Sequence, residues 1–298
     1  MPTQYWLMLS FYCVLLMISG SLIGYIIVGL FLEVIVSCVC TVAFLFRLKY
    51  WVMKSLAYYS LGLTPVVLSR IPAETDWMAP YELDRASSFA ARSDRDDYIA
   101  AHWLVREVAS HVVGSVPERL MIGQVCSDCG GNHGKPFLRG HPHIHLSLSH
   151  TIGVVAAAVG EVAIAIDVES NVAERLDDSV LETVMTSSEL SILRQVDIDP
   201  TSDALKEGGA RRLWCAKECL IKLGLLTLDT MCVADLSRLL TPSHKHICRR
   251  YLGESMNVSF FDISDTSIDV HGIFACELDM TKCEFMPIAH GVSSIVRL

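Results

Sequence analysis

The sequence predicts an α+β fold, in which helices and mainly antiparallel strands are mixed along the chain. Two stretches have the spacing of charged surface helices, namely residues 83–113 and the polar stretch that ends at Leu225. Short apolar or alternating runs, bounded by glycine, proline and serine, lie between and after them. Such runs are typical of strands.

The first elements follow from these patterns in chain order. Residues 65–69, Pro-Val-Val-Leu-Ser, predict a short first strand. The helical pattern of residues 83–113 meets Gly114, which is a helix stop. Residues 120–125 predict another strand, and residues 126–140 a loop rich in glycine.

The later elements are mostly strands. Residues 145–148 and 154–159 alternate as strands, and we expect a turn at Ser149-His150 to join them. A strand over residues 163–169 precedes the second helical stretch. Further strands are predicted over residues 258–263, 272–278 and 291–296.

Length, charge and cysteine content limit the classes of function. The 298 residues suffice for one large domain or two small ones. The net charge is -9 and no basic stripe is evident, which argues against a nucleic-acid partner. The 11 cysteines are scattered rather than regularly spaced, which favours reduced thiols in a cytoplasmic domain.

The N-terminal segment, residues 1–54, is strongly apolar. Glu33 is the one charged side chain in residues 5–46, a run long enough to cross a membrane. The basic residues that follow it predict a cytosolic location for the rest of the chain. Two interpretations stay open: a membrane anchor, or a start codon placed too far upstream, with Met53 as the true start.

Two acidic strings carry the strongest chemical signal. Asp167 and Glu169 share one face of the strand predicted over residues 163–169, because side chains alternate along a strand. Glu218 and Lys222 share a helix face at a spacing of four residues. If the strand and helix pack together, three carboxylates and a lysine converge, and such oxygen donors suit Mg²⁺. The alternative is a solvated strand end and a surface ion pair.

A second group of possible metal ligands lies in the glycine-rich loop. Cys126, Cys129 and His133 have the composition of a zinc site, although a fourth ligand is not evident. A reduced turn without metal is the alternative.

Five ordered segments resemble 4'-phosphopantetheinyl transferases of the larger, monomeric type, over roughly residues 65–280. They are Ile-Ala-Ile-Asp-Val-Glu and Trp-Cys-Ala-Lys-Glu-Cys-Leu-Ile-Lys around Asp167 and Glu218, with Ser149-His150, Gly134-Lys135-Pro136 and an arginine-rich helix from Arg92 upstream. One departure is Ala165, where the family has glycine.

The resemblance implies two similar α/β halves related by a pseudo-twofold, with the active site between them. We place the division at Gly160, which gives halves of residues 64–160 and 161–298, although no repeat is obvious in the sequence. It also implies a monomer.

The implied activity is transfer of 4'-phosphopantetheine from coenzyme A to a serine of an apo acyl or peptidyl carrier protein. The reaction needs Mg²⁺ and releases adenosine 3',5'-bisphosphate. Carriers of this kind serve fatty acid biosynthesis and secondary metabolism. Two alternatives are a catalytically inactive module that binds coenzyme A or a carrier protein, and a membrane protein with a zinc-stabilised cytosolic domain of unrelated function.

The resemblance also implies roles for single residues. Asp167, Glu169 and Glu218 would ligate Mg²⁺, and Glu218 is expected to be the general base, with Glu169 as the competing choice. Lys222 would stabilise pyrophosphate charge or steer the base. The expected contacts to coenzyme A come from six residues: Arg92, Arg95, Lys135, Ser149, His150 and, more weakly, Lys217.

Overall fold

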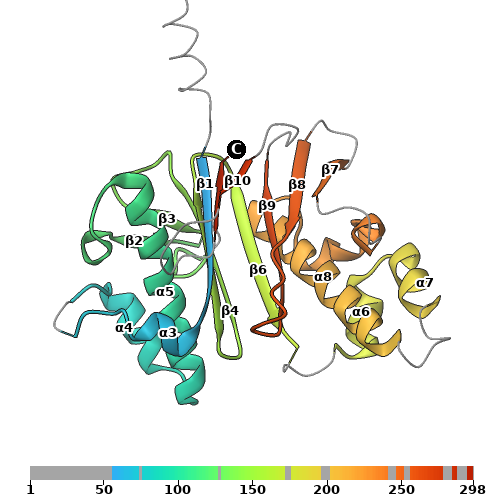
Figure 1. The fold of residues 1–298 in the computed structure, drawn as a ribbon, viewed down its shortest axis with the longest axis horizontal. Helices are drawn as coiled ribbons and strands as arrows, with labels where there is room; N and C mark the ends of the chain where they lie inside the picture. Colours follow the sequence, from blue (N-terminus) through green and yellow to red (C-terminus); the bar gives the residue numbers. More distant parts are fainter. Residues whose placement is uncertain are drawn as a thin grey trace, which may run out of the picture. The chain divides into compact units, whose positions relative to one another are not determined.

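A computed structural model describes most of the chain after the apolar N-terminal segment. Every strand pair in it is antiparallel, which confirms the α+β expectation (Figure 1). The described residues are 56–297 without 74–75, 127–128, 172–175, 196–201, 241–245, 252–255, 278–283 and 287–293.

The first half joins short helices and one long helix to a sheet. The long helix α5 ends where Gly114 takes a left-handed conformation with φ of 66°. Its apolar face packs on strands β4 and β5. The elements are β1 (Leu56–Leu63), α3 (Thr64–Leu68), α4 (Pro80–Ser87), α5 (Arg92–Val113), η1 (Pro117–Arg119), β2 (Ile122–Gln124), β3 (Pro136–Leu138), β4 (His145–Thr151) and β5 (Val154–Gly160).

Two local expectations in this half are wrong. Residues 65–69 are not a strand, because Pro65 occupies the first turn of α3, where its fixed φ suits a helix. The turn between β4 and β5 lies at Ile152-Gly153, and Gly153 has a φ of 73°. Ser149 and His150 therefore belong to β4 itself.

The second half repeats the pattern of one strand, short helices, one long helix and further strands. The C-terminal strands β10 and β11 join the first sheet, in which β11 pairs with β1. The elements are β6 (Ile164–Ser170), α6 (Asp178–Val184), α7 (Ser187–Gln195), α8 (Ser202–Leu223), η3 (Leu228–Val233), η4 (Ser237–Leu240), β7 (His246–Tyr251), β8 (Met256–Asp262), β9 (Val270–Cys276), β10 (Glu284–Met286) and β11 (Ser294–Arg297).

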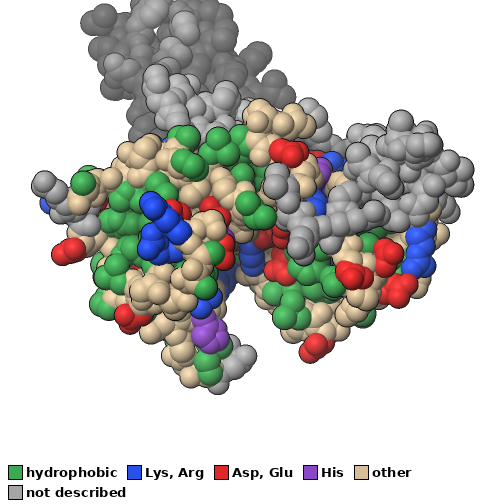
Figure 2. Space-filling view, turned by 90° about the horizontal axis from the view of Figure 1, so that it is seen from below, with side chains coloured by type: hydrophobic (Ala, Val, Ile, Leu, Met, Phe, Trp, Pro, Cys, Tyr) green, Lys and Arg blue, Asp and Glu red, His purple; other side chains and the backbone are tan. Residues whose placement is uncertain are grey.

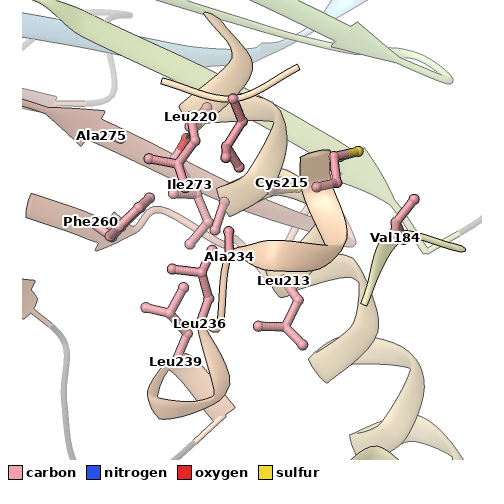
Figure 3. Close-up of a cluster of buried hydrophobic side chains, with 14 of the residues drawn as sticks. Val184, Leu213, Cys215, Leu220, Ala234, Leu236, Leu239, Phe260, Ile273 and Ala275 are labelled. Atoms are coloured by element: carbon pink, nitrogen blue, oxygen red, sulfur yellow. Dashed lines mark hydrogen bonds between the residues drawn. The ribbon is translucent and has the colours of Figure 1, made fainter. Parts of the chain in front are cut away.

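The core of the second half lies between α8 and the sheet formed by β6, β9, β8 and β7. Leu213 and Leu220 of α8 are buried against Phe260, Ile273 and other apolar side chains (Figure 3). This packing holds α8 against β6 and β9, and it fixes which face of the helix is turned toward them.

The two sheets pack face to face, with α5 and α8 on their outer sides (Figure 1). Tyr59 of β1 stacks on Phe274 of β9, at 5.8 Å between ring centroids. Ile164, Ile166 and Val168 enter this layer, as the predicted alternation requires.

A repeat that was not evident in the sequence becomes visible in the two long helices. Trp103, Arg106 and Glu107 of α5 have the same spacing as Trp214, Lys217 and Glu218 of α8. The sheet orders also correspond, since β1-β5-β4-β3 matches β6-β9-β8-β7.

Each long helix holds a buried ion pair at this repeated position. Arg106 lies 2.6 Å from Glu82 of α4, and Lys217 lies 2.9 Å from Glu189 of α7, with all four side chains inaccessible to solvent. Glu82 also accepts from the backbone N–H of Ala79, as a helix-capping residue. The pairs fix a short helix to each long one.

Hydroxyl groups join the halves where β4 meets β6. Strand β6 is the edge of its sheet, so its outward N–H groups have no strand partner there. Ser147 and Thr151 accept from the N–H groups of Ile166 and Ser170, at 3.0 and 3.2 Å. The β4 side chains thus substitute for a neighbouring strand.

The apolar segment, residues 1–54, lies outside the described residues, so the two interpretations of it stay predictions. In the described ranges, helices with the length and hydropathy of a membrane span are absent. The division at Gly160 and its two residue ranges also stay a prediction.

Removing one partner of a buried ion pair leaves an uncompensated charge in the core. We expect Arg106→Ala to lower the free energy of unfolding by about 3 kcal/mol or more. Arg194→Ala removes the exposed Arg194–Glu182 pair and should cost less than about 1 kcal/mol. Urea denaturation of both variants measures the difference, and equal losses would contradict a structural role for Arg106.

Candidate functional site

Strand β6 and helix α8 bring the two acidic strings together. Ala165, on the same face of β6 as Asp167, is fully buried in the core beneath α8. Glu218 and Lys222 occupy successive turns of α8. The predicted packing of this helix on this strand is therefore present, and alanine at position 165 is accommodated in it.

Asp167 is the most constrained member of the group. Its side chain is buried, and its Oδ1 accepts from Lys222 Nζ at 2.7 Å and from Ser149 Oγ at 2.8 Å. Lys222 Nζ also donates to the carbonyl oxygens of Ile166, at 2.9 Å, and Leu148, at 3.5 Å. One ammonium group thus connects α8, β6 and β4.

The second oxygen of Asp167 has no such support. Oδ2 is buried and lacks a hydrogen-bond partner among the described residues. A buried carboxylate oxygen without a donor is costly, because it has lost water and gained nothing in return. This orphaned oxygen marks a position that fits a cation.

Glu169 and Glu218 are half-buried beside Asp167. Burial and the charge of Asp167 raise the pKa of Glu169 to about 7, against the opposing charges of Arg211 and Lys222. Burial and Asp167 also raise the pKa of Glu218, and Lys222 opposes the shift. The three carboxylates therefore repel one another, and a divalent cation would relieve that repulsion.

Lys222 serves the site through Asp167. Burial is the largest single influence and would lower the pKa of its ammonium, but Asp167, Cys219 and Glu218 together outweigh burial and raise the pKa. The ammonium therefore stays charged at neutral pH, 2.7 Å from Asp167 Oδ1. The expected roles of Lys222, toward the pyrophosphate or the base, stay predictions.

The first half provides Ser149 and His150 from adjacent positions of β4. Ser149 is buried, and it accepts from the N–H of Val168 at 3.4 Å while it donates to Asp167. His150 is exposed on the opposite face of the strand. Reduced hydration lowers the pKa of His150, and the positive charge of Lys222 lowers it further. Asp97 has the opposite effect but does not reverse the shift. The ring is therefore neutral at pH 7.

Lys217 does not reach the acidic cluster. It is fully buried, and its ammonium donates to the carbonyl oxygens of Met231 and Ala234, both at 2.8 Å, and pairs with Glu189. Its three donors are thereby used inside the second half. This placement corrects the expected phosphate contact, because a helix neighbour of Glu218 points away from the face that carries Glu218.

The other predicted contacts to coenzyme A lie in the first half. Arg92 and Arg95 occupy the first turn of α5, and both pair with Asp96 at 3.4 Å. Arg92 is largely exposed and Arg95 is half-exposed. Lys135 is exposed just before β3. Their roles stay predictions.

Sequence reasoning missed Arg211. This residue is buried on α8, and its charge opposes the raised pKa of Glu169. Arg211, Glu218 and Lys222 are spaced by seven and four residues, which places them along one helix face. From this spacing, the sequence could have predicted that Arg211 lies on the same helix face as Glu218 and Lys222.

The molecular surface has a hollow with charged side chains at its inner end (Figure 2). Viewed from below, the molecule is hollowed between its two halves, with acidic and basic side chains at the inner end of the hollow (Figure 2).

Glu107, the residue of α5 that corresponds to Glu218, differs in its surroundings. It accepts from Arg70 at 2.6 Å and from Trp103 at 2.8 Å, whereas the Glu218 carboxylate makes no hydrogen bond or ion pair with a described residue.

The raised pKa of Glu169 predicts a pH dependence of stability for the metal-free protein. Between its ordinary value of 4.5 and about 7 the folded state binds this proton more tightly, so stability falls as pH rises through that window. Glu169→Gln should make the free energy of unfolding depend less on pH in this window. Glu182→Gln, which changes an exposed glutamate, should leave the pH dependence as it is. Urea unfolding in EDTA across this range tests it; parallel slopes for all three proteins would contradict the assigned burial of Glu169.

Comparison with protein families agrees with this geometry. Residues 163–263 match the family model of the 4'-phosphopantetheinyl transferase superfamily. The match includes the acidic cluster and ends just after β8, whereas Ser149 and the earlier candidates lie outside it. Curated proteins give no match. The expected resemblance to this superfamily is confirmed for the segment of residues 163–263.

Proposed function

We propose that the protein transfers 4'-phosphopantetheine from coenzyme A to a serine of an apo carrier protein. The superfamily match supports phosphopantetheine transfer as the class of reaction. The observation that carries the proposal is the orphaned Oδ2 of Asp167 beside Glu169 and Glu218. A buried acidic group of this kind suits chemistry on a pyrophosphate when a cation is bound.

Asp167, Glu169 and Glu218 fit Mg²⁺ as its protein ligands. All three offer hard oxygen donors, which magnesium prefers, and few protein ligands leave positions for water and phosphate oxygens. When bound, the ion would neutralise charge on the pyrophosphate and polarise it toward attack. Lys222 and Ser149 hold Asp167 in place from the opposite side, through Oδ1.

The step itself is an in-line transfer between oxygens. The carrier serine forms a bond to the β-phosphorus, and the bond from that phosphorus to the bridging oxygen of the pyrophosphate breaks. Adenosine 3',5'-bisphosphate leaves with the bond electrons. The serine proton passes to a carboxylate, and Glu218 is our choice because its pKa is raised and it makes no hydrogen bond or ion pair with a described residue.

Glu169 is the competing base. Its pKa is raised to about 7, which suits a base that works near neutral pH. Either assignment predicts a rate that rises with pH while the base loses its proton.

Coenzyme A would enter from the side of β4 and α5. His150 is exposed on β4 and reduced hydration lowers its pKa, so it can donate to a phosphate as a neutral imidazole. Arg92 and Lys135 supply exposed positive charge in the first half, and Arg95 is half-exposed. We propose phosphate contacts for all four, and a monomer in the cytoplasm as the working form.

The test is mass spectrometry of an apo carrier protein after incubation with the full chain, coenzyme A and Mg²⁺. We expect the carrier to gain the mass of one phosphopantetheine arm and EDTA to prevent the gain. Asp167→Asn and Glu218→Gln should each lower kcat/KM by about 10²-fold or more, the scale of losing a catalytic acid–base or metal ligand group. 

Glu107→Gln is the matched control, because it changes the corresponding glutamate of the first half. It should fold and keep its activity. Full activity of both Asp167→Asn and Glu218→Gln would overturn the assignment of the site. Coenzyme A binding without transfer to several carriers would favour the inactive binding module instead.

A further inference from the structure

A second group of metal-ligating side chains lies outside the acidic cluster. Among the described residues, the ligand atoms of Cys126, Cys129 and His133 all come within 4.8 Å of one another. All three belong to the loop between β2 and β3. The proposed transfer reaction makes no use of these groups.

The loop backbone is folded around the two sulfurs. The N–H of Gly130 donates to the carbonyl oxygen of Cys126 at 3.0 Å, and the N–H of Cys126 donates to that of Gly131 at 2.9 Å. The Gly131 N–H also points at Cys129 Sγ, at 3.4 Å. Such a backbone contact orients the sulfur, as hydrogen bonds to the ligands of metal sites do.

Glycine is required where the turn is tightest. Gly130 has a φ of 69° and Gly134 a φ of 104°, both in the left-handed region. A Cβ at Gly131 would come within 3.3 Å of Cys129 Sγ and 3.1 Å of the His133 ring. The absence of side chains here lets the three ligand groups approach one another.

We propose that Cys126, Cys129 and His133 bind one Zn²⁺ ion. Two thiolates and an imidazole are soft and borderline donors, which select zinc and disfavour Mg²⁺. The fourth tetrahedral position would be taken by water, since Cys129 and His133 are exposed. The site is thus chemically distinct from the carboxylate cluster around Asp167.

The spacing of the ligands suits the ion after a small adjustment. Ligand atoms on a tetrahedral zinc lie about 3.6 Å apart, given Zn–S and Zn–N bond lengths of about 2.3 and 2.0 Å. Cys129 Sγ and His133 Nε2 are 3.0 Å apart, in contact with each other. A slight opening of side chains that are exposed to solvent admits the ion.

Zinc would order the approach to Lys135. His133 is followed directly by Gly134-Lys135-Pro136, and the Gly134 carbonyl accepts from Gln124 Nε2 at 2.9 Å. A metal joining Cys126 to His133 closes this loop at its base. The proposed contact of Lys135 with coenzyme A rests on the transferase function, whereas zinc binding does not.

The experiment measures zinc in the full chain purified under reducing conditions and equilibrated with Mg²⁺ buffer. Elemental analysis should find one zinc per chain. Replacing zinc by Co²⁺ should produce thiolate-to-cobalt charge-transfer absorption. Cys129→Ser and His133→Asn should each lose the zinc and weaken this absorption.

Two controls separate this site from the rest of the protein. Cys232→Ser removes an exposed cysteine on η3 and should keep the zinc. Asp167→Asn should also keep it while losing transfer activity, so failure of either proposal is seen independently. Zinc below stoichiometry after zinc loading, equal zinc in Cys129→Ser, or a Cys126–Cys129 disulfide found by mass analysis would overturn the proposal.

Discussion

The contact between Lys222 and Asp167 is the interaction on which the candidate site depends. One ammonium group joins helix α8 to β6 and, through the Leu148 carbonyl, to β4 of the other half. It compensates the buried charge of Asp167 through Oδ1 and leaves Oδ2 unengaged. Without it, a buried carboxylate would face two other carboxylates with no positive charge to compensate it.

The two halves share one arrangement of helices and strands, but their corresponding glutamates have different surroundings. Arg106–Glu82 and Lys217–Glu189 are corresponding buried pairs, and each holds a short helix against a long one. Beyond these pairs the halves diverge. Glu107 is engaged by Arg70 and Trp103, whereas Glu218 is left beside Asp167 with a raised pKa. The ion pairs maintain the fold, and the unengaged glutamate is available for chemistry.

Patterns that depend on local geometry were predicted well from the sequence. The alternation along residues 163–169 placed Asp167 and Glu169 on one face, and Gly114 ends α5 as expected. Pro65 was misread because proline at a helix start and proline beside a strand look alike in a short apolar run. The β4–β5 turn lies beyond Ser149-His150 because Gly153 supplies the left-handed residue.

Contacts between distant segments could not be predicted in the same way. The Lys217 side chain is buried because Glu189 and two carbonyl oxygens near η3 surround it, and nothing in its own neighbourhood of the sequence indicates them. Ser149 supports Asp167 through the junction of two sheets. The matched spacing of Trp103-x-x-Arg106-Glu107 and Trp214-x-x-Lys217-Glu218 was present in the sequence, but the structure makes its meaning visible.

The central claim is that Asp167 presents one free oxygen to a divalent cation. Titration of the full chain with Mn²⁺, followed by electron paramagnetic resonance with and without coenzyme A, tests it most directly. We expect one bound Mn²⁺ that Mg²⁺ displaces, and loss of that binding in a folded Asp167→Asn variant. Unchanged Mn²⁺ binding in Asp167→Asn would contradict the claim.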